Sequence, residues 1–183
     1  MQAILKDIAK MLVALSLSAA AGTAVAANDG AEYASATLKD VNNKVIGFAS
    51  FTEDATGRLH VNVHVKGLSV GPHGTHIHAT GNCSHSATTK FAGAGGHHNP
   101  LLREHGLNNP SGAHAGDLPN LEVNASGVGH LNDSTDRATL SPGPTTVFDP
   151  NGSALVIHAL QDDQFTNPTG NSGDRIACGV IEP

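Results

Sequence analysis

Apolar and polar residues alternate strictly in the segment Arg58 to Lys66, which reads RLHVNVHVK. Leu59, Val61, Val63 and Val65 fall on one face, and the polar residues between them fall on the other. Successive side chains of a β-strand point to opposite faces, so a period of two is typical of a strand with one buried face. The segment is therefore predicted to form a half-buried antiparallel strand.

Several other short segments have strand character and are bounded by Gly, Pro, Asn or Asp. They are Glu32 to Lys39, Val45 to Thr52, Leu121 to Val123, Gly127 to Leu131 and Ala154 to Ala159. No segment after residue 26 carries a convincing 3.6-residue apolar period. Short strands with frequent turn signals predict an all-β sandwich or barrel. Two long stretches, Ala79 to Pro119 and Gln161 to Asp174, interrupt the pattern, and loops of that length are usually functional.

The beginning of the chain predicts export. Lys6 and Lys10 precede an apolar run from Met11 to Ala21, and Ala24-Val25-Ala26 offers a small-x-small cleavage site. The run is shorter than the roughly 20 apolar residues of a membrane helix, although an uncleaved anchor is an alternative. We expect residues 1 to 26 to be a secretory signal peptide and residues 27 to 183 to be one domain outside the cytoplasm, in the periplasm.

The chain contains two cysteines, Cys83 and Cys178, and its formal net charge is −6. An even cysteine pair in an exported protein predicts a disulfide, and two unpaired buried thiols are the alternative. The absence of a basic block argues against a nucleic-acid partner.

Histidines are concentrated in three motifs between residues 73 and 117: GPHGTHIHATG, AGGHHNPLLREHG and AHAGDLP. With the isolated His158 in SALVIHAL, they provide enough donors for two metal ions. Imidazole-rich sites suit copper and zinc. A single carboxylate, Asp117, among nitrogen donors argues against calcium and magnesium, which prefer mostly oxygen.

The spacing suggests how these donors divide. His76 and His78 are one residue apart, so on a strand both imidazoles project from the same face, about 7 Å apart at Cα. With His97 from the loop and His158 from another strand, they would suit the tetragonal nitrogen geometry of Cu(II). A closed tetrahedral site of the zinc type could be formed by His97, His105, His114 and Asp117.

At this level of detail the chain resembles the bacterial, periplasmic-type copper,zinc superoxide dismutases. The resemblance covers nearly all of residues 27 to 183 and rests on the motifs HGTHIH, CS, AGGHHNP, LREHG, AHAGDLP, ALVIH and GDRIACGVI. It implies an all-β, Greek-key antiparallel β-barrel or sandwich with two long functional loops. It also implies dismutation of superoxide to oxygen and hydrogen peroxide by a copper centre cycling between Cu(II) and Cu(I), next to a structural zinc.

The resemblance assigns roles to individual residues. The implied copper ligands are His76, His78, His97 and His158. The implied zinc ligands are His97, His105, His114 and Asp117. His97 would then be a bridging imidazolate that takes up a proton and returns it to the forming peroxide. Arg175 would bind the substrate anion, and Cys83 would pin the loop that orients it. Asp162 would bond one histidine of each group, expected to be His76 and His105.

The remaining histidines and cations are less defined. We expect His60, His64 and His130 to face solvent, with His130 near a turn, while His73 and His85 have no assigned role. His98 adjoins His97, and the spacing to His105 favours His97 as the bridge. The loop from Gln161 to Asp174 has no lysine, so attraction of superoxide beyond Arg175 would have to come from Lys90 or Arg103.

Two other classes of protein compete with an enzyme: a non-enzymatic periplasmic copper- or zinc-binding protein on the same fold, and a structural or adhesive sandwich with a zinc-stiffened loop. The complete ligand set with Arg175 favours the enzyme, and the lack of Trp and the few aromatic residues argue against adhesion. Superoxide is the expected partner, and no nucleic acid or, after signal cleavage, membrane is expected. A homodimer is left open.

Overall fold

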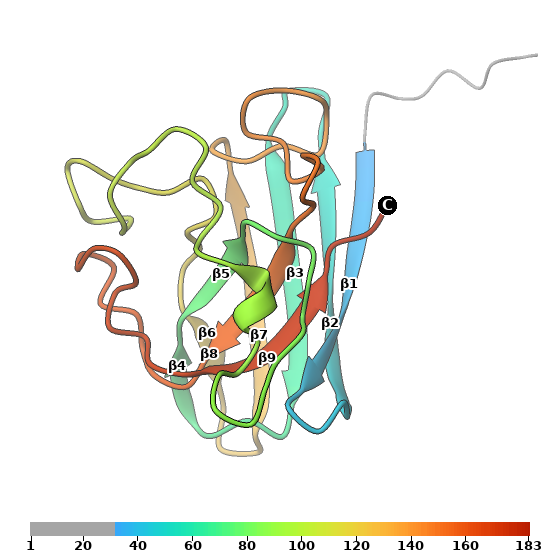
Figure 1. Cartoon of the computed structure of the whole chain (residues 1–183), viewed down its shortest axis with the longest axis vertical. Helices are drawn as coiled ribbons and strands as arrows, with labels where there is room; N and C mark the ends of the chain where they lie inside the picture. Colours follow the sequence, from blue (N-terminus) through green and yellow to red (C-terminus); the bar gives the residue numbers. More distant parts are fainter. Residues whose placement is uncertain (1–31) are drawn as a thin grey trace, which may run out of the picture.

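The computed structural model describes residues 32–183, which form a nearly closed antiparallel β-barrel (Figure 1). The predicted signal peptide lies outside the described residues. The strands are β1 (Glu32–Asp40), β2 (Val45–Glu53), β3 (Leu59–Lys66), β4 (Gly71–His73), β5 (Thr75–His78), β6 (Leu121–Val123), β7 (Val128–Thr135), β8 (Ala154–His158) and β9 (Arg175–Val180). A single turn of 3-10 helix, η1 (Ala92–Ala94), lies in the first long loop. The prediction of an all-β barrel is confirmed.

The strand order explains how the barrel closes. It runs β4-β6-β7-β3-β2-β1-β9-β8-β5, with every neighbouring pair antiparallel. The two end strands, β4 and β5, are consecutive in the chain and are separated only by Gly74. A Cβ at Gly74 would press against the side chains of Ser172 and Asp162, so glycine is needed where the edges of the sheet meet.

The core follows the alternation seen in the sequence. In β3 the apolar residues are buried, and His64 and Lys66 are exposed, as predicted. The same inward faces from β1, β2 and β7 supply residues such as Leu38, Phe51 and Leu131 to one large cluster. Burial of this apolar surface is the main force that holds the barrel together.

The main differences from the predicted strands are at β7 and β9; β4 was not predicted either, and several other boundaries differ by one residue. β7 continues to Thr135, four residues past the predicted end, because its polar residues pair with the whole length of β3. His130 lies within this strand, as the predicted range had it, and is exposed. The strand β9 was not predicted, because its small residues give little strand signal. A Cβ at Gly179 would collide with the backbone of Thr37 on β1, so the close approach of these strands requires glycine there.

The two long loops lie on the same side of the barrel (Figure 1). Hydrogen bonds join them: the Gln164 side chain donates to the Leu118 carbonyl at 3.1 Å, and the His105 N–H donates to the Asn167 side chain at 3.0 Å. The predicted disulfide between Cys83 and Cys178 is confirmed, and it ties the first loop to β9 across 95 residues of sequence. Across the described part of the chain, no helix is long and apolar enough to cross a membrane.

Candidate metal centre

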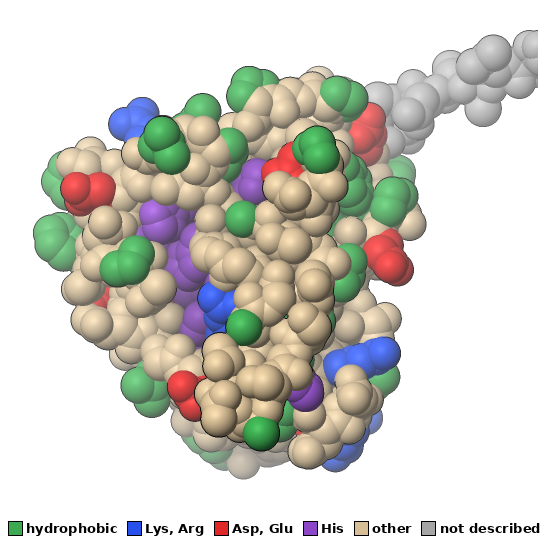
Figure 2. Space-filling view, viewed as in Figure 1, with side chains coloured by type: hydrophobic (Ala, Val, Ile, Leu, Met, Phe, Trp, Pro, Cys, Tyr) green, Lys and Arg blue, Asp and Glu red, His purple; other side chains and the backbone are tan. Residues whose placement is uncertain are grey.

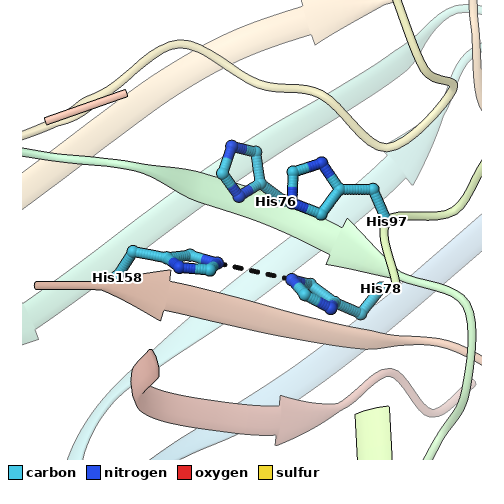
Figure 3. Close-up of side chains that lie close together, drawn as sticks. All are labelled: His76, His78, His97 and His158. Carbon is cyan, nitrogen blue, oxygen red and sulfur yellow. Dashed lines mark hydrogen bonds between the residues drawn. The ribbon is translucent and has the colours of Figure 1, made fainter. Parts of the chain in front are cut away.

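Four histidine side chains converge where β5, β8 and the first long loop meet (Figure 3). His76 and His78 lie on β5, His158 ends the neighbouring strand β8, and His97 comes from the loop. One nitrogen from each ring lies within 4.8 Å of the other three, and none of the four residues is more than 9% exposed. We call these residues the four-histidine group.

Two of these rings form hydrogen bonds to backbone carbonyl groups through Nδ1, the nitrogen that faces away from the centre of the group. His78 donates from Nδ1 to the Gly95 carbonyl at 3.0 Å, and His158 donates from Nδ1 to the Gly173 carbonyl at 3.1 Å. Hydrogen bonds of this kind fix the tautomer and the orientation of an imidazole. They leave the two Nε2 atoms 3.4 Å apart and facing the interior of the group.

The other two rings each present a nitrogen with no partner. His76 is held through Nε2 by Asp162, with 2.6 Å between Nε2 and Oδ2, and His97 is held through Nδ1 by Asp117 at 3.0 Å. Among the described residues, His76 Nδ1 and His97 Nε2 are buried without any hydrogen bond. Each unsatisfied buried group costs about 1–3 kcal/mol. Four nitrogens gathered in this way fit a copper ion, which prefers imidazole ligands.

A second set of donors surrounds one oxygen of Asp117. The Nδ1 atoms of His97, His105 and His114 lie 3.0, 3.0 and 3.2 Å from Asp117 Oδ1. Donor atoms about 2.0–2.1 Å from a tetrahedral zinc ion would lie about 3.3 Å from one another. The other oxygen of Asp117 accepts the backbone N–H groups of Gly106 and His114, which fixes the carboxylate. These four residues, the His₃Asp group, fit zinc.

Asp162 connects the two groups. Its Oδ2 accepts from His76 Nε2, and its Oδ1 accepts from His105 Nε2 at 3.0 Å. The side chain of Asn120 exchanges two hydrogen bonds with the Asp162 backbone, and a Cβ at Gly170 would collide with the carboxylate. His76 also has a ring nitrogen within 4.8 Å of donors of His97, His105 and Asp117, but its Nε2 is held by Asp162, so we assign its unpartnered Nδ1 to the four-histidine group.

Burial keeps the four-histidine group neutral. It lowers the pKa of His76 to about 3, with further repulsion from His97, and it lowers the pKa of His158 to about 4. The pKa of His78 also falls well below its usual value, again mainly by burial. Neutral imidazoles have a free lone pair, so these residues are available as ligands at pH 7 without losing a proton.

The His₃Asp group is charged by contrast. Burial raises the pKa of Asp117, but hydrogen bonds from His105, His114 and His97 outweigh it and hold that pKa far below its usual range. Burial lowers the pKa of His105, but its bonds to Asp117 and Asp162 dominate and raise it to about 9. The carboxylate is therefore ionised at neutral pH and offers a negative ligand to a cation.

Residues 45–181 match the family of copper/zinc superoxide dismutase (SODC). The chain belongs to this family. It is 41% identical over 180 residues to "Superoxide dismutase [Cu-Zn]" of Deinococcus radiodurans, with 93% of each chain covered. It is 42% identical over 146 residues to "Superoxide dismutase-like protein YojM" of Bacillus subtilis, covering 79% of this chain and 73% of that one.

The fold has the same relatives. A crystal structure of a SOD-like protein from Bacillus subtilis superposes with a TM-score of 0.74 at 40% identity, covering 80% of this chain and 96% of that chain. The comparison of folds therefore agrees with the comparison of sequences.

Next to the four-histidine group, this superoxide dismutase family member has an open pocket of about 450 Å³ (Figure 2). Gly95 and Gly173, whose carbonyls hold His78 and His158, line the pocket together with Arg175. Arg175 is half-buried and donates to the carbonyls of Phe91 and Gly95. These carbonyls lie in the loop that the disulfide anchors, and they aim the guanidinium at the pocket.

Lys90 and Arg103, the other cations predicted to attract the substrate, do not add unpaired positive charge at the edge of the pocket. Lys90 lines the pocket, but its Nζ lies 3.0 Å from Asp174 Oδ2, so its charge is paired. Arg103 lines a different pocket and does not border this one. Arg175 is therefore the unpaired cation among the residues that line the pocket.

All of the predicted ligand residues, with Asp162 and Arg175, lie in this one region. His85 and His98 lie outside both groups: His85 packs edge-on against Phe91, and His98 Nε2 donates to the Thr145 carbonyl.

Some supporting residues could not be recognised in the sequence. His73 is buried and donates from Nδ1 to the backbone carbonyl of His158 at 2.6 Å. Arg137 donates to the backbone carbonyl of Asp117 at 2.9 Å. Each of these hydrogen bonds joins residues that are at least 20 positions apart in the sequence, and no local motif indicates either contact.

Proposed function

We propose that this protein catalyses the dismutation of superoxide: one superoxide is oxidised to oxygen, and a second takes up one electron and two protons to give hydrogen peroxide. The observation that carries the proposal is the arrangement of His97. Its Nδ1 faces the His₃Asp donors, while its Nε2 is buried, unpartnered and turned towards the other three histidines.

Each group of donors suits a different metal ion. Copper would be held by His76, His78, His97 and His158, and zinc by His97, His105, His114 and Asp117. Copper would supply the one-electron change between Cu(II) and Cu(I), and zinc, which has no redox chemistry, would fix His97 and the loop.

The protein's own groups bind the substrate and handle one proton. A guanidinium stays charged and has five N–H donors, so Arg175 can bind a small anion while it donates to Phe91 and Gly95. His97 Nε2 can take up a proton and return it to the reduced oxygen species, because its other nitrogen is already engaged. The second proton comes from solvent through the open pocket.

The test is superoxide consumption by purified protein whose copper and zinc are quantified. One copper and one zinc per chain, with rapid consumption, is the expected result. The alternative on the same fold, a non-enzymatic copper- or zinc-binding protein, predicts the same metal content without consumption. Zinc alone after copper loading would overturn the copper assignment.

We also propose that the protein works in the periplasm. The sequence of residues 1 to 26 supports export, and the Cys83–Cys178 disulfide suits an oxidising compartment. Cell fractionation followed by sequencing of the mature N-terminus, expected near Ala27, tests this proposal. A homodimer stays a prediction, which sedimentation at several concentrations would check.

A further inference from the structure

A second pair of histidines lies on the outer surface of the barrel, away from the metal centre. His64 on β3 and His130 on β7 are direct cross-strand neighbours, and both are exposed. Their Nε2 atoms are 2.9 Å apart and share a hydrogen bond, which a bound ion would replace, and the ring centroids are 3.7 Å apart with the rings at 75°. We call them the surface histidine pair. We propose that this pair binds a divalent transition-metal ion, with Cu(II) preferred.

The distance between the nitrogens supports this ligand chemistry. Two nitrogens about 2.0 Å from a metal and 90° apart, as in tetragonal Cu(II), are about 2.8 Å from each other. At a tetrahedral zinc ion the same separation would be about 3.3 Å. The surface histidine pair, at 2.9 Å, is therefore close to the geometry of two neighbouring ligands of Cu(II). Imidazole sites in general also bind Cu(II) more tightly than the other divalent first-row metals.

The rings are held in this arrangement before any ion arrives. Phe48 on β2 is the cross-strand neighbour of His64 on its other side, and the two rings stack at 5.4 Å with an interplanar angle of 20°. The strand pairing fixes the two backbones, and this stacking restricts the His64 ring. A pair of ligands that is already positioned loses less conformational entropy on binding.

A third protein ligand requires a change of side-chain rotamer, because among the described residues no carboxylate oxygen lies within 4.8 Å of both Nε2 atoms. Glu122 on β6 is the cross-strand neighbour of His130, and its side chain is exposed on the same outer face. Side chains of directly opposed residues in adjacent antiparallel strands are within reach of each other. Lys66 lies two residues after His64 on the same face of β3, and its positive charge would repel a bound cation. Water would complete the coordination, because the site is open to solvent.

This site is separate from the metal centre. The surface histidine pair lies on the paired strands β3 and β7, whereas three members of the four-histidine group lie on the paired strands β5 and β8. The surface histidine pair shares no residue with the four-histidine group or the His₃Asp group. Its ion would therefore be bound in addition to one copper and one zinc, and the proposal does not depend on the dismutase activity.

The experiment is a calorimetric titration of Cu(II) into protein that already holds its full complement of inner metals, verified by elemental analysis. One additional Cu(II) per chain is expected. His64→Gln and His130→Gln should each weaken this additional binding by more than about tenfold, since even hydrogen-bonding partners of metal ligands are worth about 10–100-fold. The electron paramagnetic resonance spectrum should show an added Cu(II) with nitrogen ligands that both variants lose.

The matched control is His60→Gln. His60 lies four residues before His64 on the same face of β3, but its Nε2 is 2.8 Å from Asp54 Oδ2 and not near a second histidine. This control should retain the additional Cu(II) site, and all three variants should keep the inner metal content and the thermal stability. Glu122→Gln should weaken binding by a smaller factor than either histidine variant.

Three outcomes would overturn the proposal. The first is no Cu(II) bound beyond the inner metals, and the second is additional binding that His64→Gln and His130→Gln leave unchanged. The third is one additional ion per two chains accompanied by dimer formation, because the proposed ligands all come from one chain.

Discussion

The four-histidine group and the His₃Asp group share His97 but are assembled in different ways. The ligands of the His₃Asp group all lie between residues 97 and 117 of one loop, around an ionised carboxylate that backbone N–H groups also hold. The four-histidine group takes His76 and His78 from one strand and His158 from another, and it contains no carboxylate. One site is thus a local cage, and the other exists only when the barrel has formed.

This difference matches the chemistry expected of each site. A closed set of donors that includes an ionised carboxylate suits a metal with a structural role. A neutral set next to an open pocket with Arg175 suits a metal that reacts with an anion, because nothing in the ligand set repels the substrate. The two groups are nevertheless connected, because His97 and Asp162 contact both.

The largest expected effect comes from removing the ligand that belongs to the four-histidine group alone. His158→Ala should abolish superoxide consumption, by at least about 100-fold, because even partners outside the ligand set change activity by 10–100-fold. Zinc content should stay at one per chain, since the His₃Asp group is untouched. Elemental analysis and a superoxide assay measure the two effects separately.

His85→Ala is the control for this comparison, because His85 is an exposed histidine outside both groups. It should leave the activity and both metals unchanged. Loss of zinc in His158→Ala would show that the two groups are not separable and would contradict the comparison.

The next largest effect concerns the disulfide that connects the loop to the barrel. Its partners are 95 residues apart, and a loop of about this length corresponds to roughly 4 to 5 kcal/mol of stabilisation in the chain-entropy model. Cys83→Ser should therefore lower the melting temperature. Activity should fall as well, because the loop carries the Phe91 and Gly95 carbonyls that orient Arg175.

Thermal melting and activity of the fully metallated Cys83→Ser protein measure both effects. The double variant Cys83→Ser/Cys178→Ser removes any contribution from a free thiol and should behave in the same way. An unchanged melting temperature in both would mean that the bond does not stabilise the metallated protein.

A smaller effect is expected from Arg175, which belongs to the pocket and to neither metal group. Arg175→Ala should reduce turnover at limiting superoxide by about tenfold or more, since local positive charge raises the encounter rate of an anion by that order. Copper content should not change. Arg175→Lys, which keeps the charge but not the planar fork of donors, should recover part of the rate. Equal losses of copper and activity in Arg175→Ala would instead indicate a structural role.

The sequence was sufficient to name the residues that the structure gathers into the two groups, but not the residues that hold them in place. Except for His158, which a separate strand segment supplied, these residues lie in the motifs between residues 73 and 117. The HxH spacing placed His76 and His78 on one strand face, and β5 has that arrangement. The family resemblance supplied Asp162 and Arg175, because an isolated loop acid or arginine has no distinctive pattern.

Other features depended on long-range contacts that no local pattern records. β9 was missed because its glycine and alanine serve the close approach of β1, which a search for branched apolar residues overlooks. His73 holds the backbone of His158, which is 85 residues away in the sequence. The strand now called β7 was predicted to end at Leu131 because the polar residues after it resemble a loop, although they pair with β3. The pairing of Lys90 with Asp174 likewise appears only when the two loops are brought together.

That ion pair leads to the smallest expected effect. Both side chains are largely solvent-exposed, at 43% for Lys90 and 72% for Asp174, and Asp174 neutralises Lys90 at the rim of the pocket. Asp174→Asn should leave one more unpaired positive charge there and raise the rate with limiting superoxide by about twofold at low ionic strength. The gain should disappear near 0.15 M salt, where charges more than about 8 Å apart are screened. In the wild type, where Arg175 is the only unpaired cation among the described residues that line the pocket, the rate should decline only modestly over the same salt range. Pulse radiolysis across a salt series measures both rates, and Asp136→Asn, which makes the same change in net charge away from the pocket, is the matched control. An equal gain in Asp136→Asn would assign the effect to net charge, whereas a steep salt dependence of the wild type would show that the pocket attracts superoxide through a wider field than Arg175 alone provides.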